Sequence, residues 1–242
     1  MPSRACVRLG GGEAMLARIP QLLSAAQVAE VRSALDAADA PWVDGRATAG
    51  HQGAAVKKNS QIEEASPLAR QLGQLVLAEL ERNRLFISAV LPHRVYPPMF
   101  NRYREGMHFG THVDGAVRMI AGSGHKLRTD LSATLFLAAP DSYAGGELIV
   151  ENDFGSESVK LAAGDAIVYT STSRHRVTPV TRGVRTACVF WIQSLIRDDQ
   201  KREQLFELDR TIQRLTESNA DADSLVRLAG HYHSLLRLWT EF

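Results

Sequence analysis

The sequence has few cysteines for its length. Only Cys6 and Cys188 occur in 242 residues, and their separation matches neither the spacing of zinc ligands nor that of redox pairs. This excludes a small fold held together by disulfides. A chain of this length can bury a sizeable apolar core without such cross-links. Free thiols are typical of a reducing compartment, which favours the cytoplasm.

Excess charge of one sign and long apolar runs are also missing. The formal net charge is +1, so nothing attracts the chain broadly to nucleic acid or to an anionic membrane. No apolar run approaches the roughly 20 residues that a membrane helix needs. Residues 1–14 are rich in glycine and lack the apolar segment of a signal peptide. We expect a cytoplasmic protein with no nucleic-acid or membrane partner. Residues 1–14 would be a flexible extension, either native or the product of an upstream start.

The rest of the sequence divides into three zones. Residues 15–91 are predicted to form a mainly helical support region, residues 92–196 a β-rich core, and residues 197–242 a C-terminal helical pair. In the last zone, apolar residues recur at steps of three and four on both sides of a polar turn, which predicts two helices with one apolar stripe each. These stripes would pack on the β-core or on another subunit, and thus offer a surface for a homo-oligomer.

Two helix starts are visible in the first zone. Ser24 followed by Gln27 forms a capping-box pattern. Ser66 precedes Pro67, and proline is favoured at the first helical position because it lacks an N–H that would have no partner there. The glycine-rich segment 44–59 between these helices predicts a loop or an irregular edge strand.

The middle zone alternates short β-rich runs with turns. Because the turns contain glycine, serine, asparagine and aspartate, the pattern is typical of an all-β sandwich or barrel. Together with the flanking helices it predicts an α+β fold. The expected strands are RVYPPMFNRYR, LSATLFLAA, GELIVEN, ESVKL, AIVYT, HRVTPV and RTACVFWIQSL. The basic, glycine-bearing segment 116–130 is expected to be a lid, a substrate loop or a disordered surface loop.

The segment MHFGTHVDGAV, residues 107–117, places His112 and Asp114 two residues apart. On an extended chain such residues point to the same side, so an imidazole and a carboxylate could share one ion. By itself the pair is weak evidence, since a histidine and an aspartate on a loop commonly form local hydrogen bonds. His175, which follows a predicted strand and a short turn, is a good third ligand. Two histidines and one carboxylate suit non-haem Fe(II) and leave coordination positions open.

Arg185 lies ten residues after His175, beyond the turn TRG. A strand, a turn and an antiparallel return would bring the two residues side by side. An arginine within an apolar strand is costly to bury unless it meets an anion. That anion is either a bound carboxylate, which a planar guanidinium grips with two hydrogen bonds, or an acidic side chain in a structural salt bridge.

These motifs resemble those of the bacterial PKHD-type hydroxylases, which belong with the prolyl-4-hydroxylase-like Fe(II)/2-oxoglutarate dioxygenases. The resemblance covers nearly the whole chain from Met15 and includes FNRYREGMHFGTHVDGAVR, the segment from VKLAAGD to SLIRDD, and the end LLRLWTEF. It implies a double-stranded β-helix, or jelly roll, closed against helices. It also implies iron bound by His112, Asp114 and His175, which act as catalytic residues and metal ligands.

The resemblance further implies that Arg185 takes the distal carboxylate of 2-oxoglutarate. Tyr103 is expected either to line the cosubstrate pocket or to be a half-buried strand tyrosine, and His108 to lie behind the ligands or to contact substrate. The family brings O2, ascorbate as a reductant, a small-molecule or peptidyl substrate, and a link to iron uptake. The alternatives are a cupin-like metalloenzyme without 2-oxoglutarate and a non-catalytic jelly roll that binds iron or a small molecule.

Overall fold

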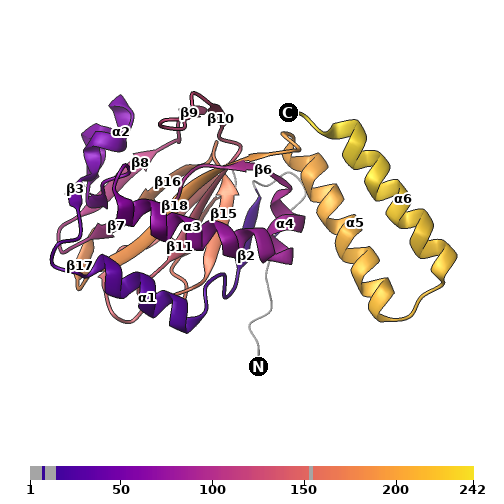
Figure 1. Cartoon of the computed structure of the whole chain (residues 1–242), viewed down its shortest axis with the longest axis horizontal. Helices are drawn as coiled ribbons and strands as arrows, with labels where there is room; N and C mark the ends of the chain where they lie inside the picture. Colours follow the sequence, from indigo (N-terminus) through magenta and orange to yellow (C-terminus); the bar gives the residue numbers. More distant parts are fainter. Residues whose placement is uncertain (1–6, 9–14, 153–154) are drawn as a thin grey trace.

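The computed structural model describes residues 7–8, 15–152 and 155–242, and it places most of the described strands in two large antiparallel sheets (Figure 1). The nine-stranded main sheet has the order β1-β2-β15-β11-β18-β7-β5-β3, and β6 also pairs with β18. Its strands are β1 (Val7–Arg8), β2 (Leu16–Ile19), β3 (Trp42–Asp44), β5 (Ser60–Ile62), β6 (Pro92–Val95), β7 (Met99–Tyr103), β11 (Leu131–Phe136), β15 (Ala166–Thr170) and β18 (Arg185–Ser194).

The second sheet has the order β14-β13-β16-β8-β4. Its strands are β4 (Lys57–Lys58), β8 (His108–His112), β13 (Leu148–Asn152), β14 (Gly155–Val159) and β16 (Arg174–Val177). Two short pairs complete the β-structure: β9 (Val117–Met119) with β10 (Lys126–Arg128), and β12 (Ala144–Gly145) with β17 (Val180–Arg182). The two sheets face each other and enclose an apolar core, as in a jelly roll.

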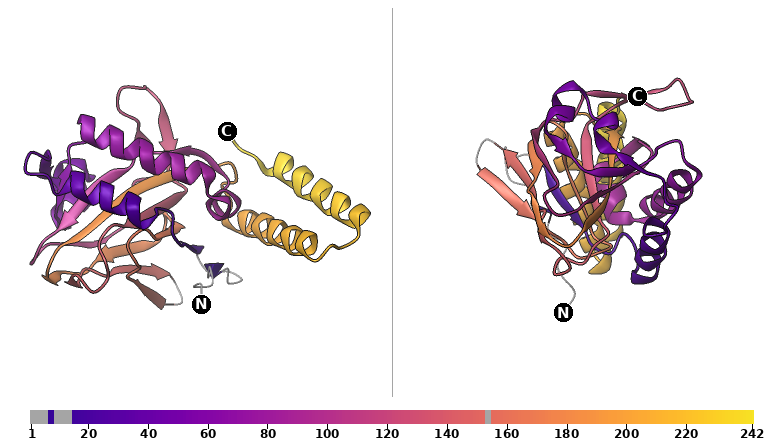
Figure 2. Two further views of the ribbon diagram at one scale, coloured as in Figure 1. Left: turned by 60° about the horizontal axis from the view of Figure 1, so that its bottom comes forward. Right: turned by 90° about the vertical axis from the view of Figure 1, so that its left-hand side faces the viewer.

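Helices cover the outer face of the main sheet (Figure 2). The helical elements are α1 (Ala25–Leu35), the 3-10 turn η1 (Gly45–Thr48), α2 (His51–Val56), α3 (Pro67–Arg82), α4 (Arg84–Val90), α5 (Asp199–Glu217) and α6 (Ala222–Trp239). Ser24 caps α1 with the predicted capping box, and Ser66 caps α3 ahead of the proline. Both predicted helix starts are therefore confirmed.

The side chains of β11 point alternately to the two faces of the main sheet, so the strand contributes to two apolar clusters. Leu131, Ala133 and Leu135 join the cluster beneath the helices. Phe136 packs between the sheets, on the side where the hydroxyl of Ser132 meets Asp114. Since successive side chains of a strand point to opposite faces, a strand buried on both faces can carry apolar and polar residues in alternation. The inner face of the main sheet thus presents polar groups to the space between the sheets.

The C-terminal helices form a hairpin that projects from the body of the molecule (Figure 1). Its base packs on Leu91 and Ile196 through Leu205 of α5, with Tyr232 and Trp239 of α6 beside them. The predicted pair of striped helices is confirmed. No helix in the described residues combines the length and the apolarity that a membrane crossing requires.

The structure corrects several boundaries. The first zone consists mainly of helices, and it also contributes the short strands β2, β3 and β5 to the main sheet, which were not predicted. The segment 44–59 was predicted to be a loop or an irregular edge strand. It contains the short edge strand β4, and η1 and α2, which were not predicted. The predicted strand 94–104 is split into β6 and β7, because neither Pro97 nor Pro98 has an N–H to donate to a ladder. Apart from Val7–Arg8, the predicted flexible extension 1–14 lies outside the described residues.

Candidate metal and cosubstrate site

Three predicted ligands meet where the second sheet faces the main sheet. His112 is the last residue of β8, and His175 lies in β16 directly opposite it in the strand register. Asp114 follows His112 by two residues, where the chain leaves β8. The fold therefore brings together two segments that are far apart in the sequence, as their strand pattern predicted.

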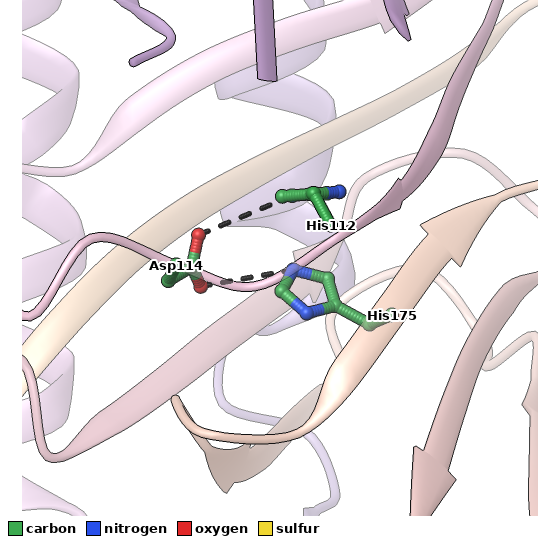
Figure 3. A group of neighbouring side chains, drawn as sticks. All are labelled: His112, Asp114 and His175. Carbon is green, nitrogen blue, oxygen red and sulfur yellow. Dashed lines mark ion pairs between the residues drawn. The ribbon is translucent and has the colours of Figure 1, made fainter. Parts of the chain in front are cut away.

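The three side chains point toward one another (Figure 3). One ligand atom from each lies within 4.8 Å of the others. The carboxylate of Asp114 bridges the histidines: Oδ1 is 4.0 Å from Nε2 of His112, and Oδ2 is 3.7 Å from Nε2 of His175. The imidazole rings are 4.2 Å apart between centroids. Two imidazoles and one carboxylate form the donor set of a facial Fe(II) site, which leaves the remaining positions free.

Backbone carbonyls fix the tautomers of both histidines. Nδ1 of His112 donates to the carbonyl oxygen of Gly110 at 2.9 Å, and Nδ1 of His175 donates to that of Ser173 at 3.1 Å. A carbonyl oxygen only accepts hydrogen bonds, so the proton of each neutral ring sits on Nδ1. The Nε2 lone pairs are then directed at the shared position, which is the form that a metal binds.

The electrostatic setting keeps His112 neutral. Burial and the adjacent His175 lower the pKa of His112 to about 4, because both disfavour the charged ring. Asp114 is held from the other side by Ser132, whose hydroxyl donates to Oδ2 at 2.6 Å and also meets the hydroxyl of Ser171 at 2.7 Å. The site thus offers a neutral imidazole at His112 and, at Asp114, a carboxylate whose orientation is fixed by a hydrogen bond.

Arg185 opens β18 and is almost fully buried, with 1% of its surface exposed. Its guanidinium lies over the rings of Tyr103 and Phe136, at 5.2 and 5.5 Å from their centroids. Within the described residues no carboxylate lies within 4.0 Å of it, and its Nε has no hydrogen-bond partner. The structural salt bridge considered for Arg185 is therefore not formed there. Such a cation fits a bound carboxylate.

A second tyrosine accompanies Arg185. Tyr143 is buried, and its hydroxyl also lacks a hydrogen-bond partner among the described residues. Burial raises the pKa of Tyr143, so the hydroxyl keeps its proton and can donate it. Gly146 packs closely against both residues, because a Cβ at this position would lie 3.1 Å from Cδ of Arg185 and 3.2 Å from the Tyr143 ring. These unpartnered donors are consistent with a small anion as their ligand.

One cavity of about 510 Å³ joins the triad to Arg185. All five predicted site residues line it: Tyr103, His112, Asp114, His175 and Arg185. Tyr103 is 2% exposed, so it is a fully buried wall of the cavity rather than a half-buried strand residue. His108 is not among the described lining residues.

Sequence reasoning missed several residues of the site. Ser132 and Tyr143 lie in the segment RTDLSATLFLAAPDSYAGGELIVEN, which contributes to the family resemblance, but neither was assigned a role. The hydrogen bond from Ser132 to Asp114 and the close approach of Gly146 to Tyr143 become visible only in the structure. Arg118 and Trp191 also line the cavity. Both lie within the quoted motifs, but neither was predicted as a site residue. The segment 116–130 that carries Arg118 forms the β9–β10 hairpin rather than a disordered loop.

Comparisons with known proteins agree with this geometry. Residues 98–193 match the model of the 2OG-Fe(II) oxygenase superfamily, and residues 199–241 match that of the PKHD-type hydroxylase C-terminal domain. A PKHD-type hydroxylase of Burkholderia ambifaria is 61% identical over 94% of this chain and 100% of its own length. A PKHD-type hydroxylase of Cupriavidus metallidurans is likewise 61% identical, with the same coverage of both chains.

Solved structures share the fold at much lower identity. The non-heme alpha ketoglutarate dependent carbocyclase SnoK from nogalamycin biosynthesis has a TM-score of 0.54 and 16% identity, over 80% of this chain and 88% of its own. A prolyl hydroxylase from Trichoplax adhaerens has a TM-score of 0.51 and 12% identity, over 78% of this chain and 86% of its own. The predicted α+β fold with a jelly-roll core is confirmed. The chain belongs to the PKHD-type hydroxylases and is an Fe(II)- and 2-oxoglutarate-dependent oxygenase.

Proposed function

We propose that His112, Asp114 and His175 hold Fe(II) and that Arg185 binds the distal carboxylate of 2-oxoglutarate. The observation that carries this proposal is an open set of three ligands sharing one cavity with a buried, unpaired guanidinium. A structural metal site is usually closed by four protein ligands, whereas the described residues supply three at this position. The three ligands thus fit Fe(II), and the unpaired guanidinium of Arg185 fits 2-oxoglutarate, the two groups that the family requires.

When bound, iron, 2-oxoglutarate and O2 supply hydroxylation coupled to decarboxylation of 2-oxoglutarate to succinate and CO2. The chain contributes position and environment. Arg185 fixes one end of the cosubstrate, and the buried Tyr143 packs beside its guanidinium. The buried rings of Tyr103 and Phe136 form an apolar wall beside the guanidinium that excludes water and strengthens these contacts.

The substrate we propose is a small molecule or a peptidyl group, because the cavity is of the size that encloses a metabolite or a side chain. The link to iron uptake and the use of ascorbate stay predictions from the family resemblance. A cupin-like enzyme without 2-oxoglutarate, or an iron-binding module without activity, would leave Arg185 with no partner. Membership of the family disfavours both alternatives.

The test is formation of succinate from 2-oxoglutarate with Fe(II) and O2, measured by mass spectrometry. His112→Ala and His175→Ala should abolish it. The matched control is His108→Ala, in the same strand as His112 but outside the cavity lining. Full turnover by either ligand variant would remove that residue from the iron site. A blank wild type is informative only with substrate candidates present, since turnover without substrate can be slow.

The cosubstrate assignment is tested with Arg185→Ala. A charge-assisted hydrogen bond contributes roughly 1.5–3 kcal/mol, so the KM for 2-oxoglutarate should rise about tenfold or more. Binding of Mn(II), followed by its paramagnetic resonance, should persist because Arg185 is not a ligand. An unchanged KM would show that another group binds the distal carboxylate.

A further inference from the structure

The cavity has a second cationic region, formed by Arg118 of β9. Its guanidinium stacks on the ring of Trp191 at 3.8 Å from the centroid and lies 4.9 Å from that of Tyr96. The two aromatic rings are perpendicular to each other, with centroids 5.6 Å apart. The stack fixes the guanidinium plane, and a stacked guanidinium can still donate hydrogen bonds from its edge.

Two N–H groups of this region lack acceptors. Nε of Arg118 and Nε1 of Trp191 are buried and have no hydrogen-bond partner among the described residues. No carboxylate of the described residues lies within 4.0 Å of the Arg118 guanidinium. The hydroxyl of Tyr96 donates instead to Glu64, at 3.3 Å. Because buried polar groups are nearly always paired, two orphaned donors side by side indicate an absent acceptor.

The charges of the lining are also unbalanced. Among the described residues the cavity is lined by three cations, Lys57, Arg118 and Arg185, and by one carboxylate, Asp114. Nζ of Lys57 contacts the oxygens of Thr48 and Gln61, which are neutral. Burial and the nearby Arg118 lower the pKa of Lys57 to about 8, so it still carries most of its charge at pH 7. Once 2-oxoglutarate occupies Arg185, Lys57 and Arg118 remain to attract an anion.

The region around Arg118 is separate from the end of the cavity that contains Arg185. Arg185 and Trp191 share one face of β18 and are six residues apart, which corresponds to roughly 20 Å along a strand. Trp191 is paired with Ser132, the residue that holds Asp114. Arg118 itself follows Asp114 by four residues. The metal ligands therefore border on the Arg118 region, while Arg185 lies farther along the strand.

We propose that Arg118, with Nε1 of Trp191 and the charge of Lys57, binds a carboxylate of the substrate that is hydroxylated. The inference rests on the proposed function, since it takes Arg185 to be used by 2-oxoglutarate. The proposal limits the substrates to molecules that carry a carboxylate. This carboxylate would bind beside Asp114, and the rest of the molecule would lie over the metal position. Arg118 is then a determinant of substrate specificity.

The test compares acids with matched amides. Binding of the N-acetyl amino acids and of their primary amides is measured by ligand-observed NMR, on protein loaded with Mn(II) and saturating 2-oxoglutarate without O2. N-acetyl aspartyl and asparaginyl amides form a second pair, which separates a side-chain carboxylate from a terminal one. Arg118→Gln and Arg118→Lys are compared with Lys126→Gln, which removes an exposed charge from the same hairpin.

At least one acid should bind about tenfold or more tightly than its amide to wild type and to the Lys126→Gln variant. Arg118→Gln should lose this preference, and Arg118→Lys should keep part of it because the charge remains without the planar fork. A merely structural stack would change binding of acids and amides alike. No acid binding, equal binding of acids and amides, or an unchanged preference in the folded Arg118→Gln variant overturns the proposal. Succinate formation by wild type is scored separately, so failure of the oxygenase assignment is recognised independently.

Discussion

Replacing Ser132 by alanine should weaken metal binding without removing any ligand. Ser132 is buried, and its hydroxyl donates to Oδ2 of Asp114 at 2.6 Å. The same carboxylate faces both His112 and His175, so its orientation governs the whole donor set. Ser132→Ala deletes the hydroxyl and leaves the β11 backbone pairing unchanged, because the strand bonds use main-chain atoms.

The magnitude follows from the type of bond. A hydroxyl that donates to a carboxylate at this distance forms a charge-assisted hydrogen bond, which contributes about 1.5–3 kcal/mol. If that contribution is lost only in the ordered, metal-binding arrangement, affinity falls by about tenfold to a hundredfold. Removal of partners that orient metal ligands has effects of the same order in other metal sites.

The assay is calorimetric titration of the metal-free protein with Mn(II), in the presence and absence of 2-oxoglutarate. Ser173→Ala is the matched control, since Ser173 is buried, its hydroxyl meets that of Thr170, and its carbonyl remains to hold His175. We expect the control to bind within about threefold of wild type. Wild-type affinity in Ser132→Ala would refute the view that this hydroxyl orients Asp114.

Two further predictions concern buried ionisable groups. Burial lowers the pKa of Lys57 from 10.5 to about 8, so between these values the unfolded chain binds more protons at Lys57 and the free energy of unfolding should rise with pH. Urea unfolding at pH 8, 9 and 10 should show this rise in the free energy of unfolding, of order 1–3 kcal/mol. The Lys57→Met variant should show a smaller rise. If wild type and variant have the same dependence on pH, the lowered pKa of Lys57 is contradicted. Burial raises the pKa of the Cys188 thiol far above its usual range, so the folded protein contains little reactive thiolate at this position. Iodoacetamide at pH 8 should therefore alkylate Cys188 at least about a hundredfold more slowly in the folded protein than in the urea-unfolded protein, because both the thiolate and access of the reagent are lost on folding. Peptide mass mapping separates Cys188 from Cys6, and similar rates in both states would show that Cys188 is accessible.

The sequence predicted the elements that depend on local chemistry. Ser24 and Ser66 cap helices because a hydroxyl satisfies backbone N–H groups wherever the helix is placed. The spacing of His112 and Asp114 predicted a shared ligand face because side-chain direction along an extended chain is a local property. The distant partner His175 could be proposed from the strand order expected of a jelly roll, and the structure places it opposite His112.

Features that depend on pairing over long distances were missed. β8 was not predicted, since its sequence HFGTH lacks apolar alternation and its pairing with β16 and β4 determines the strand. Ser132 sits in an apolar run, and nothing in that run shows that the residue meets Asp114. The roles of Arg118 and Trp191 likewise arise only when β9 folds over β18. Tertiary contacts, rather than local preferences, create these parts of the site.

If His112 and His175 bind the metal as proposed, metal binding stabilises the folded chain, because the strand register is what brings the two histidines together. The two strands that carry these histidines are distant in sequence, so an unfolded chain cannot present the same donor set to one ion. An ion bound at a hundred times its dissociation constant would shift the folding equilibrium by about 2.7 kcal/mol toward the native state. Iron shortage would then lower the folded population as well as the number of loaded sites. The abundance of this oxygenase would be coupled to the availability of its metal.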